Sequence, residues 1–198
     1  MRKIRWPAET GRRIFSFPHG RGAASDRCSA DRPAGPTRES YLLVTSAVMT
    51  GPSPSIGALL ADTVPMARTL GLEYLETSAE RAVLRLPDQP EYRNHVGGPH
   101  AGAMFTLAES ASGCAVLAAF GDQLSRAVPL LVRAEIAYRK LAMGPVTATA
   151  VLGRPAGEVV AELDRGERPE FTVTVEIARE DGAVTGEMTA VWTLRPHP

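Results

Sequence analysis

Residues 101–121 read AGAMFTLAESASGCAVLAAFG and contain one charged side chain, that of Glu109. A helix that is apolar on all sides is buried over most of its surface. Many residues in this run are alanine, serine or glycine, and such small side chains let a sheet approach closely. Helix propensity alone would not favour Gly102 and Gly113 here, so we attribute them to packing. The stretch therefore predicts a long central helix over about residues 101–120, enclosed by a sheet.

The sequence on both sides of this helix predicts the partners that enclose it. A shorter helix is expected to begin at Pro54 after the N-cap residue Ser53, to be limited or kinked by Pro65, and to end at Gly71. Strand-like runs occupy residues 72–77, 81–86, 128–140, 146–152, 171–178 and 183–194. The order is helix, two strands, long helix, four strands. Short turns between neighbouring strands favour an antiparallel sheet and an α+β fold class.

Two details of this sheet are further expectations. In the run 128–140, one alternating face is predicted to carry Leu130, Val132, Ala134, Ile136 and Tyr138. Residues 153–168 contain several glycine and proline breaks and are predicted to form a long loop, in which residues 159–163 could add to a strand.

Length and charge suggest one domain with a tail. Residues 1–48 hold nine Lys/Arg against four Asp/Glu, so this segment carries +5 and the remainder −5. We expect residues 1–52 to be a disordered basic tail and linker, with Met49 as a real or alternative start, and residues 53–198 to be the domain. The net charge of zero gives no general attraction to nucleic acid or an anionic membrane, so neither is expected as a partner. Glu109 and the small residues around it argue against a membrane span.

Cysteine and histidine usage indicates neither a disulfide framework nor a metal site. The two cysteines, Cys28 and Cys114, cannot form a disulfide framework, and we expect reduced thiols in a cytoplasmic protein, with Cys114 in the core. The four histidines form no closely spaced ligand cluster with Cys or Asp, so a metal site is not expected.

Glu109 is the first candidate for chemistry. An ionised carboxylate in an apolar helix is costly unless it is paired, hydrogen-bonded or wetted by a cleft. Asn94 and His100 lie in the loop before the helix, and the helix N-terminus offers unpaired N–H groups suited to a developing oxyanion. The structural alternative is that Glu109 pairs with an arginine of the sheet, such as Arg133, or protrudes into solvent. Spacing alone does not decide between these two interpretations.

The segment from Asn94 to Glu109, NHVGGPHAGAMFTLAE, resembles the hotdog-fold acyl-CoA thioesterases of the phenylacetate-pathway and 4-hydroxybenzoyl-CoA type. It looks closest to relatives that read N-H-V-G-x-x-H-A-G-A-x-F-T-L-x-E. In that superfamily an Asn or Gln lies about six residues before a His-Gly-Gly turn, and an Asp or Glu lies nine residues after the His. Residues 138–144, YRKLAMG, are similar to a further turn of the family. The resemblance covers roughly residues 53–195.

The resemblance implies a role for each matched residue. Glu109 would act as nucleophile or as general base toward water, and the N–H of Ala101 would polarise the thioester carbonyl. Asn94 would orient water or the carboxylate, and His100 would shape the turn. The chain departs from the family in having His-Ala-Gly where many relatives have His-Gly-Gly, so Ala101 must adopt a conformation open to a residue with a Cβ. Further substrate-binding candidates are Gly102, Arg133, Arg139 and Lys140, the last three for the CoA phosphates.

The resemblance also implies an assembly and a reaction. In such families the site lies between two protomers, so a homodimer or a dimer of dimers is expected. The function indicated is hydrolysis of an acyl-CoA or a related acyl thioester, without a cofactor. An alternative from another class is a non-catalytic acyl-CoA-binding or sensing module that keeps the pocket. A hotdog dehydratase or hydratase fits less well, because the Asp-x-x-x-x-His arrangement on the helix is absent.

Overall fold

The structure is a computed structural model that describes residues 56–197. The expectations for the tail and linker, for a start at Met49 and for Cys28 lie outside the described residues. Within them, the element order predicted from the sequence is confirmed, with one additional helix.

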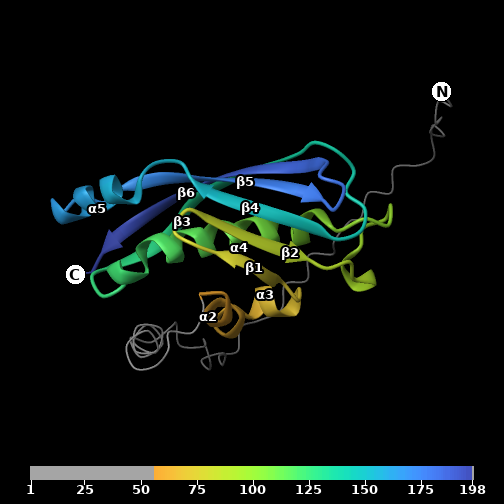
Figure 1. Cartoon of the computed structure of the whole chain (residues 1–198), viewed down its shortest axis with the longest axis horizontal. Coiled ribbons are helices and arrows are strands. Elements are labelled where there is room, and N and C mark those ends of the chain that lie inside the picture. The colour runs from red at the N-terminus through yellow and green to blue at the C-terminus, as the bar shows by residue number, and fades with distance from the viewer. Residues whose placement is uncertain (1–55, 198) are drawn as a thin grey trace, which may run out of the picture. The chain divides into compact units, whose positions relative to one another are not determined.

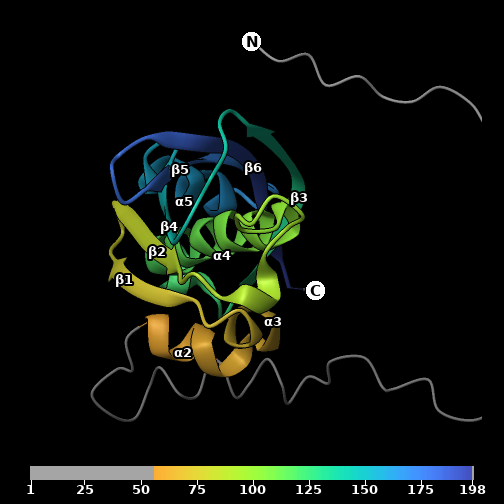
Figure 2. The same ribbon diagram turned by 90° about the vertical axis from the view of Figure 1, so that its right-hand side faces the viewer.

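Six antiparallel strands form one sheet in the order β1-β2-β4-β5-β6-β3. The strands are β1 (Glu73–Thr77), β2 (Arg81–Leu86), β3 (Ala127–Tyr138), β4 (Val146–Leu152), β5 (Glu170–Arg179) and β6 (Val184–Pro196). The sheet curves around the long helix α4 (Ala101–Phe120), with β1 and β2 on one side of the helix and β3 on the other (Figures 1 and 2). A long central helix wrapped by a curved antiparallel sheet is the hotdog fold.

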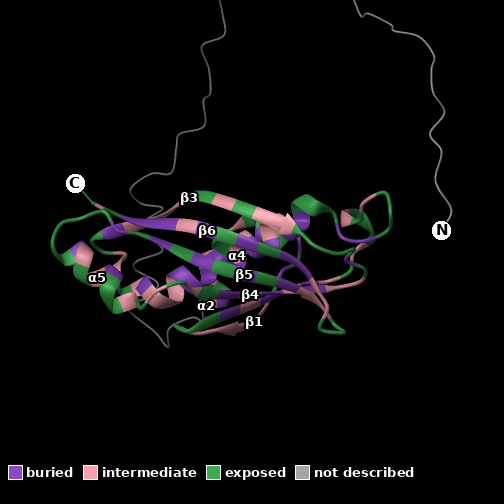
Figure 3. Cartoon of the chain, turned by 90° about the horizontal axis from the view of Figure 1, so that it is seen from above, coloured by how far each residue is buried: buried purple, intermediate pink, exposed green. Residues whose placement is uncertain are grey.

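Alternation along the strands explains which face packs against α4. In β5 the side chains of Phe171, Val173, Val175 and Ile177 are buried, whereas Thr172, Thr174 and Glu176 between them are exposed. This period of two is visible as alternating buried and exposed segments along the sheet (Figure 3). The strand pattern therefore follows directly from which face meets the helix.

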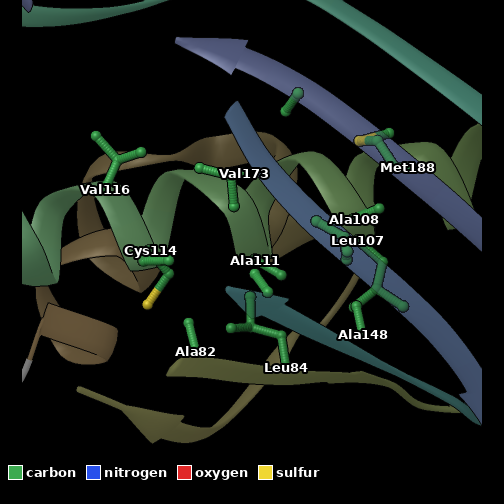
Figure 4. Close-up of a cluster of buried hydrophobic side chains, with 14 of the residues drawn as sticks. Ala82, Leu84, Leu107, Ala108, Ala111, Cys114, Val116, Ala148, Val173 and Met188 are labelled. Atoms are coloured by element: carbon green, nitrogen blue, oxygen red, sulfur yellow. The ribbon is translucent and has the colours of Figure 1, made fainter. Parts of the chain in front are cut away.

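Ten of the twenty residues of helix α4 are buried, in keeping with its apolar composition. From Ala103 to Phe120 no residue is exposed. Figure 4 shows Leu107, Ala108, Ala111 and Cys114 of the helix among side chains of four strands: Ala82 and Leu84 of β2, Ala148 of β4, Val173 of β5 and Met188 of β6. Alanines on both partners let the sheet approach the helix closely. Cys114 is a free, buried thiol in this core, and burial raises its pKa to about 12.

Length and composition alone would let the helical stretch Ala101–Gln123 cross a membrane. In the fold it is instead the core helix, with the sheet packed around it.

Helices α2 (Ile56–Thr63) and α3 (Pro65–Thr69) cover a side of α4 that the sheet leaves open (Figure 2). Val64 separates them, because Pro65 occupies the first position of α3 and cannot donate a main-chain hydrogen bond. The predicted kink at Pro65 is confirmed. Gly71, with a φ of 60°, ends the segment in a conformation that glycine adopts readily.

Residues 153–168 were predicted to be a long loop with strand character at 159–163, and this prediction is wrong. They contain helix α5 (Ala156–Asp164), which follows the N-cap residue Pro155. Val159 and Leu163, four residues apart, are buried on one face of this helix. Helix α5 has only nine residues, too few for its helical period to stand out among the Gly and Pro breaks.

The predicted face of β3 is wrong in its first half. A β-bulge between Leu131 and Arg133 shifts the register, so Pro129 and Leu131 pair with the buried residues Leu194 and Trp192. Past the bulge, Ala134, Ile136 and Tyr138 continue that same face, as their pairing with Ala190, Met188 and Gly186 requires. Leu130, between Pro129 and Leu131, therefore lies on the opposite face of the strand. A one-residue bulge reverses the side-chain alternation, and no turn residue marks its position in the sequence.

Candidate active site

Glu109 lies in the middle of α4, where its side chain is half-buried. Within residues 56–197 its carboxylate has neither an ion-pair partner nor a hydrogen-bond donor, and Arg133 is exposed on β3 without a bond to it. Burial raises the pKa of Glu109 above its ordinary value of 4.5. The structural alternative of a Glu109–Arg133 pair is therefore absent, and the helix carries an unpaired carboxylate.

The Glu109 side chain borders a cavity of about 200 Å³ between α4, α2 and the β3–β6 side of the sheet. Its lining is mainly apolar: Leu60, Val64, Val116, Leu117, Pro129 and Trp192, with Gly113 and the polar residues Tyr74, Glu109 and Ser110. A concave, mostly apolar space with a few convergent polar groups and one perturbed carboxylate is the usual form of a small-molecule site.

Two polar residues of this lining, Tyr74 and Ser110, did not stand out in the sequence. Their hydroxyl oxygens are buried and have no hydrogen-bond partner in the described residues. Burial, with smaller contributions from Cys114 and Glu109, raises the pKa of Tyr74 to about 12, so the phenol stays protonated. Ser110 could have been suspected because it follows Glu109 directly, but Tyr74 lies in β1, and no sequence spacing links it to the helix.

The loop before α4 is a compact turn organised by Asn94. Its side-chain oxygen accepts hydrogen bonds from the N–H groups of Val96 (2.9 Å) and Gly98 (3.3 Å), and its amide nitrogen donates to the carbonyl of Pro99 (3.1 Å). His100 is the N-cap of α4: its Nδ1 accepts a hydrogen bond of 3.0 Å from the Gly102 N–H. Both residues thus shape this turn, and neither bonds to Glu109.

Ala101 is the first residue of α4 and has helical backbone geometry. An alanine adopts this conformation without strain, so the departure from His-Gly-Gly does not distort the turn. Its N–H has no acceptor among residues 56–197 and lies at the positive end of the helix. Ala101 and Gly102 are both exposed, so a ligand can reach this end.

The turn and the carboxylate are separated along the helix. Glu109 follows Ala101 by eight positions in the helix, which corresponds to about 12 Å at 1.5 Å per residue. The structure thus brings Asn94, His100 and Ala101 together at the start of α4, whereas Glu109 lies two turns further on. Within one chain these groups cannot contact the same carbonyl.

A second loop, residues 139–145, packs against this turn. The Tyr138 hydroxyl donates a hydrogen bond of 2.8 Å to the Ala101 carbonyl, and a Cβ added to Gly98 would lie 2.1 Å from the carbonyl oxygen of Ala142. Arg139 and Lys140 therefore lie near the start of α4. Arg139 pairs with Glu187 at 2.9 Å, and both side chains are more than half exposed.

Arg133 is placed differently from these two cations. It precedes Tyr138 by five residues in the strand, about 17 Å, and the register turns it away from α4. The structure therefore does not bring Arg133 to the turn, unlike Arg139 and Lys140. Across the part of the chain that the structure describes, no group of three or more His, Cys, Asp or Glu side chains could hold a metal ion.

The wrapped helix places the chain in the hotdog thioesterase-like superfamily. Within it, residues 55–194 match the family described as Domain of unknown function (DUF4442), and the chain belongs to that family. No curated protein matches it in sequence.

Solved structures show the same architecture. PA5026 from Pseudomonas aeruginosa, a protein of unknown function described as a probable thioesterase, is 26% identical with a TM-score of 0.66, over 72% of this chain and 94% of that one. The PaaI protein from the phenylacetic acid degradation operon of E. coli is 15% identical with a TM-score of 0.54, over 68% of this chain and 87% of its own. The second likeness concerns the fold alone.

Proposed function

We propose that this protein hydrolyses an acyl-CoA or a related acyl thioester, with Glu109 as its catalytic carboxylate. The observation that carries the proposal is the unpaired carboxylate of Glu109 on the wall of an apolar cavity, with a pKa raised by burial. A carboxylate with a raised pKa is a stronger base than an exposed one, and without a cation beside it, it is free to react. The resemblance of the Asn94–Glu109 segment to thioesterases supports the same role.

Two routes use this carboxylate. As general base, Glu109 takes a proton from water while the water oxygen bonds to the thioester carbonyl carbon; the carbon–sulfur bond then breaks, and the proton passes to the leaving thiolate. As nucleophile, a Glu109 oxygen bonds to that carbon and displaces the thiolate, and water cleaves the resulting anhydride. Both routes place negative charge on the carbonyl oxygen, which needs an N–H donor.

The free N–H of Ala101 is the donor that suits this oxygen, and we propose that it comes from a second copy of the chain. The separation of about 12 Å along α4 prevents the two groups of one chain from acting on one carbonyl. Strand β3 supports pairing of two copies: it is an edge of the sheet and twelve residues long, so one side of it has unpaired main-chain groups. In a symmetric dimer each Glu109 would face the turn of its partner.

Asn94 and His100 would then serve by holding the turn in shape, and Arg139 and Lys140, close to the same turn, would meet the CoA phosphates. The His-Ala-Gly departure and the basic tail are the two features that favour the non-catalytic alternative. Because Ala101 is helical, an alanine there keeps the N–H donor in place, which favours the enzyme.

The test measures hydrolysis of short, medium, long and aromatic acyl-CoAs, with the release of free thiol as the readout. We expect wild type to turn over part of this panel and Glu109→Gln to lose about 10²- to 10⁴-fold in kcat. The matched control is Glu158→Gln, which neutralises an exposed carboxylate on α5, away from the β3 edge, and should keep its activity. Full activity in Glu109→Gln, or tight binding without hydrolysis across the panel in wild type, would refute the proposal.

A further inference from the structure

The cavity beside Glu109 extends along α4 in one direction only. Its helical lining residues are Glu109, Ser110, Gly113, Val116 and Leu117, so it runs toward the C-terminal end of the helix for about 12 Å. The start of α4, with the turn and the free N–H, lies in the opposite direction. A molecule whose reacting carbon is at Glu109 therefore has an apolar space on one side.

The chemistry of the walls indicates a mostly apolar occupant with a polar end. Leu60 of α2, Val64 between α2 and α3, and Trp192 of β6 supply apolar lining outside α4. The unpartnered hydroxyls of Tyr74 and Ser110 also belong to the lining; Ser110 directly follows Glu109, and the Tyr74 phenol interacts electrostatically with Cys114 and Glu109. Unpaired buried hydroxyls are uncommon in native proteins, and a ligand with an oxygen close to Glu109 would give them a partner.

Gly113 lies one helical turn beyond Glu109 and has no steric reason to be glycine. A Cβ added there would meet the Trp192 ring at 3.5 Å and 3.7 Å, which is ordinary contact. At Gly57, by contrast, an added Cβ would lie 2.7 Å from the Cβ of Tyr74, so α2 needs that glycine to pack. A glycine inside a helix costs about 0.5–1 kcal/mol relative to alanine. The absence of a side chain at Gly113 leaves open space in the cavity that it lines.

From these observations we propose, building on the thioesterase function above, that the cavity holds the acyl group and that Gly113 sets the length it accepts. A cavity of about 150 Å³ holds one benzene molecule, so the 200 Å³ here accommodates roughly eight carbon atoms. The substrate class is an acyl thioester with a straight chain of up to about that length or with a single aromatic ring. Leu117 is the lining residue of α4 furthest along the helix from Glu109.

The experiment measures kcat/KM for acyl-CoAs with chains of two to fourteen carbons. Gly113→Ala should lower the value for octanoyl-CoA about 10-fold relative to butyryl-CoA, because the added methyl shortens the space. Leu117→Ala should act in the opposite direction and raise the value for dodecanoyl-CoA relative to octanoyl-CoA about 10-fold. Gly157→Ala is the matched control: it makes the same change in a helix, α5, where nothing lies within 4 Å of the added Cβ. Its chain-length profile should equal that of wild type.

A binding measurement separates this inference from the proposed function. Calorimetry with S-alkyl-CoA thioethers, which cannot be hydrolysed, gives the same length profile without catalysis. A length limit in thioether binding that shifts in Gly113→Ala supports the inference even if no acyl-CoA is hydrolysed. The inference would be overturned if hydrolysis and binding showed the same length dependence in wild type, Gly113→Ala and Leu117→Ala. That result would leave the thioesterase proposal standing.

Discussion

The indole N–H of Trp192 donates a hydrogen bond of 3.1 Å to the hydroxyl oxygen of Ser112, deep in the core. Ser112 in turn donates to the carbonyl oxygen of Glu109 at 2.7 Å. This relay ties strand β6 to the turn of α4 that carries the candidate carboxylate. Because Trp192 also lines the cavity, one side chain both anchors the helix and shapes the space beside Glu109.

Breaking this relay should destabilise the fold. Trp192→Phe removes the indole donor, so the buried Ser112 hydroxyl keeps only the hydrogen bond that it donates to the Glu109 carbonyl, and we expect this to cost about 1–3 kcal/mol in the free energy of unfolding. Chemical denaturation of Trp192→Phe, Ser112→Ala and the double variant checks this. The two effects should be non-additive by about 0.5–1.5 kcal/mol. Strictly additive effects would mean that the bond contributes nothing to stability.

The raised pKa of Glu109 predicts a pH-dependent stability difference between wild type and Glu109→Gln. Since the folded-state pKa lies above the unfolded value, Glu109 favours folding most when both states are protonated, and that contribution is lost as pH rises through the folded pKa. At pH 7 the glutamine variant should therefore be more stable than wild type, on the order of 1 kcal/mol.

This gain should shrink as the pH falls through the raised pKa of Glu109 toward the ordinary value of 4.5, because both states of wild type then become protonated. Thermal or urea unfolding of the two proteins from pH 4 to pH 8 measures it. A gain that stays constant across this range would show that the carboxylate does not titrate with a shifted pKa.

Gly98 should tolerate no side chain. An added Cβ would lie 2.1 Å from the Ala142 carbonyl oxygen, so the two loops at the start of α4 would have to separate. We expect Gly98→Ala to cost about 2–3 kcal/mol in unfolding free energy and to lower hydrolysis through the displaced turn. Gly121→Ala is the control, because nothing lies within 4 Å of a Cβ at that helix end. Equal stability of the two variants would contradict the packing of these loops.

Much of the fold could be predicted from the sequence because its signals are local. The apolar run 101–120, with its single charge and many small residues, predicts a buried helix, and the observed α4 has those bounds. The strands 81–86 and 146–152 also coincide with prediction, since clear alternation is bounded by turn residues. Helix α5 and the β3 bulge were missed because the helix is short and the bulge depends on pairing with a distant strand.

The site could be predicted only in part. The sequence spacing predicted a group made of Asn94, His100, Ala101 and Glu109, because these residues lie close together along the chain. The sequence could not show that Glu109 is unpaired, because this depends on the tertiary fold. Tyr74, Leu60 and Trp192 reach the cavity from three other elements. No sequence period relates such residues, because tertiary packing alone brings them together.

The measurement that tests the account most directly mixes two inactive variants. Glu109→Gln lacks the carboxylate, and Asn94→Ala loosens the turn that holds the Ala101 N–H. If each site combines Glu109 of one chain with the turn of another, co-expression of the two variants assembles one intact site in each mixed dimer. Hydrolysis should then return to about a quarter of the wild-type rate when the chains mix at random. A mixture no more active than its two components, although size and stability match wild type, would contradict an active site shared between two copies.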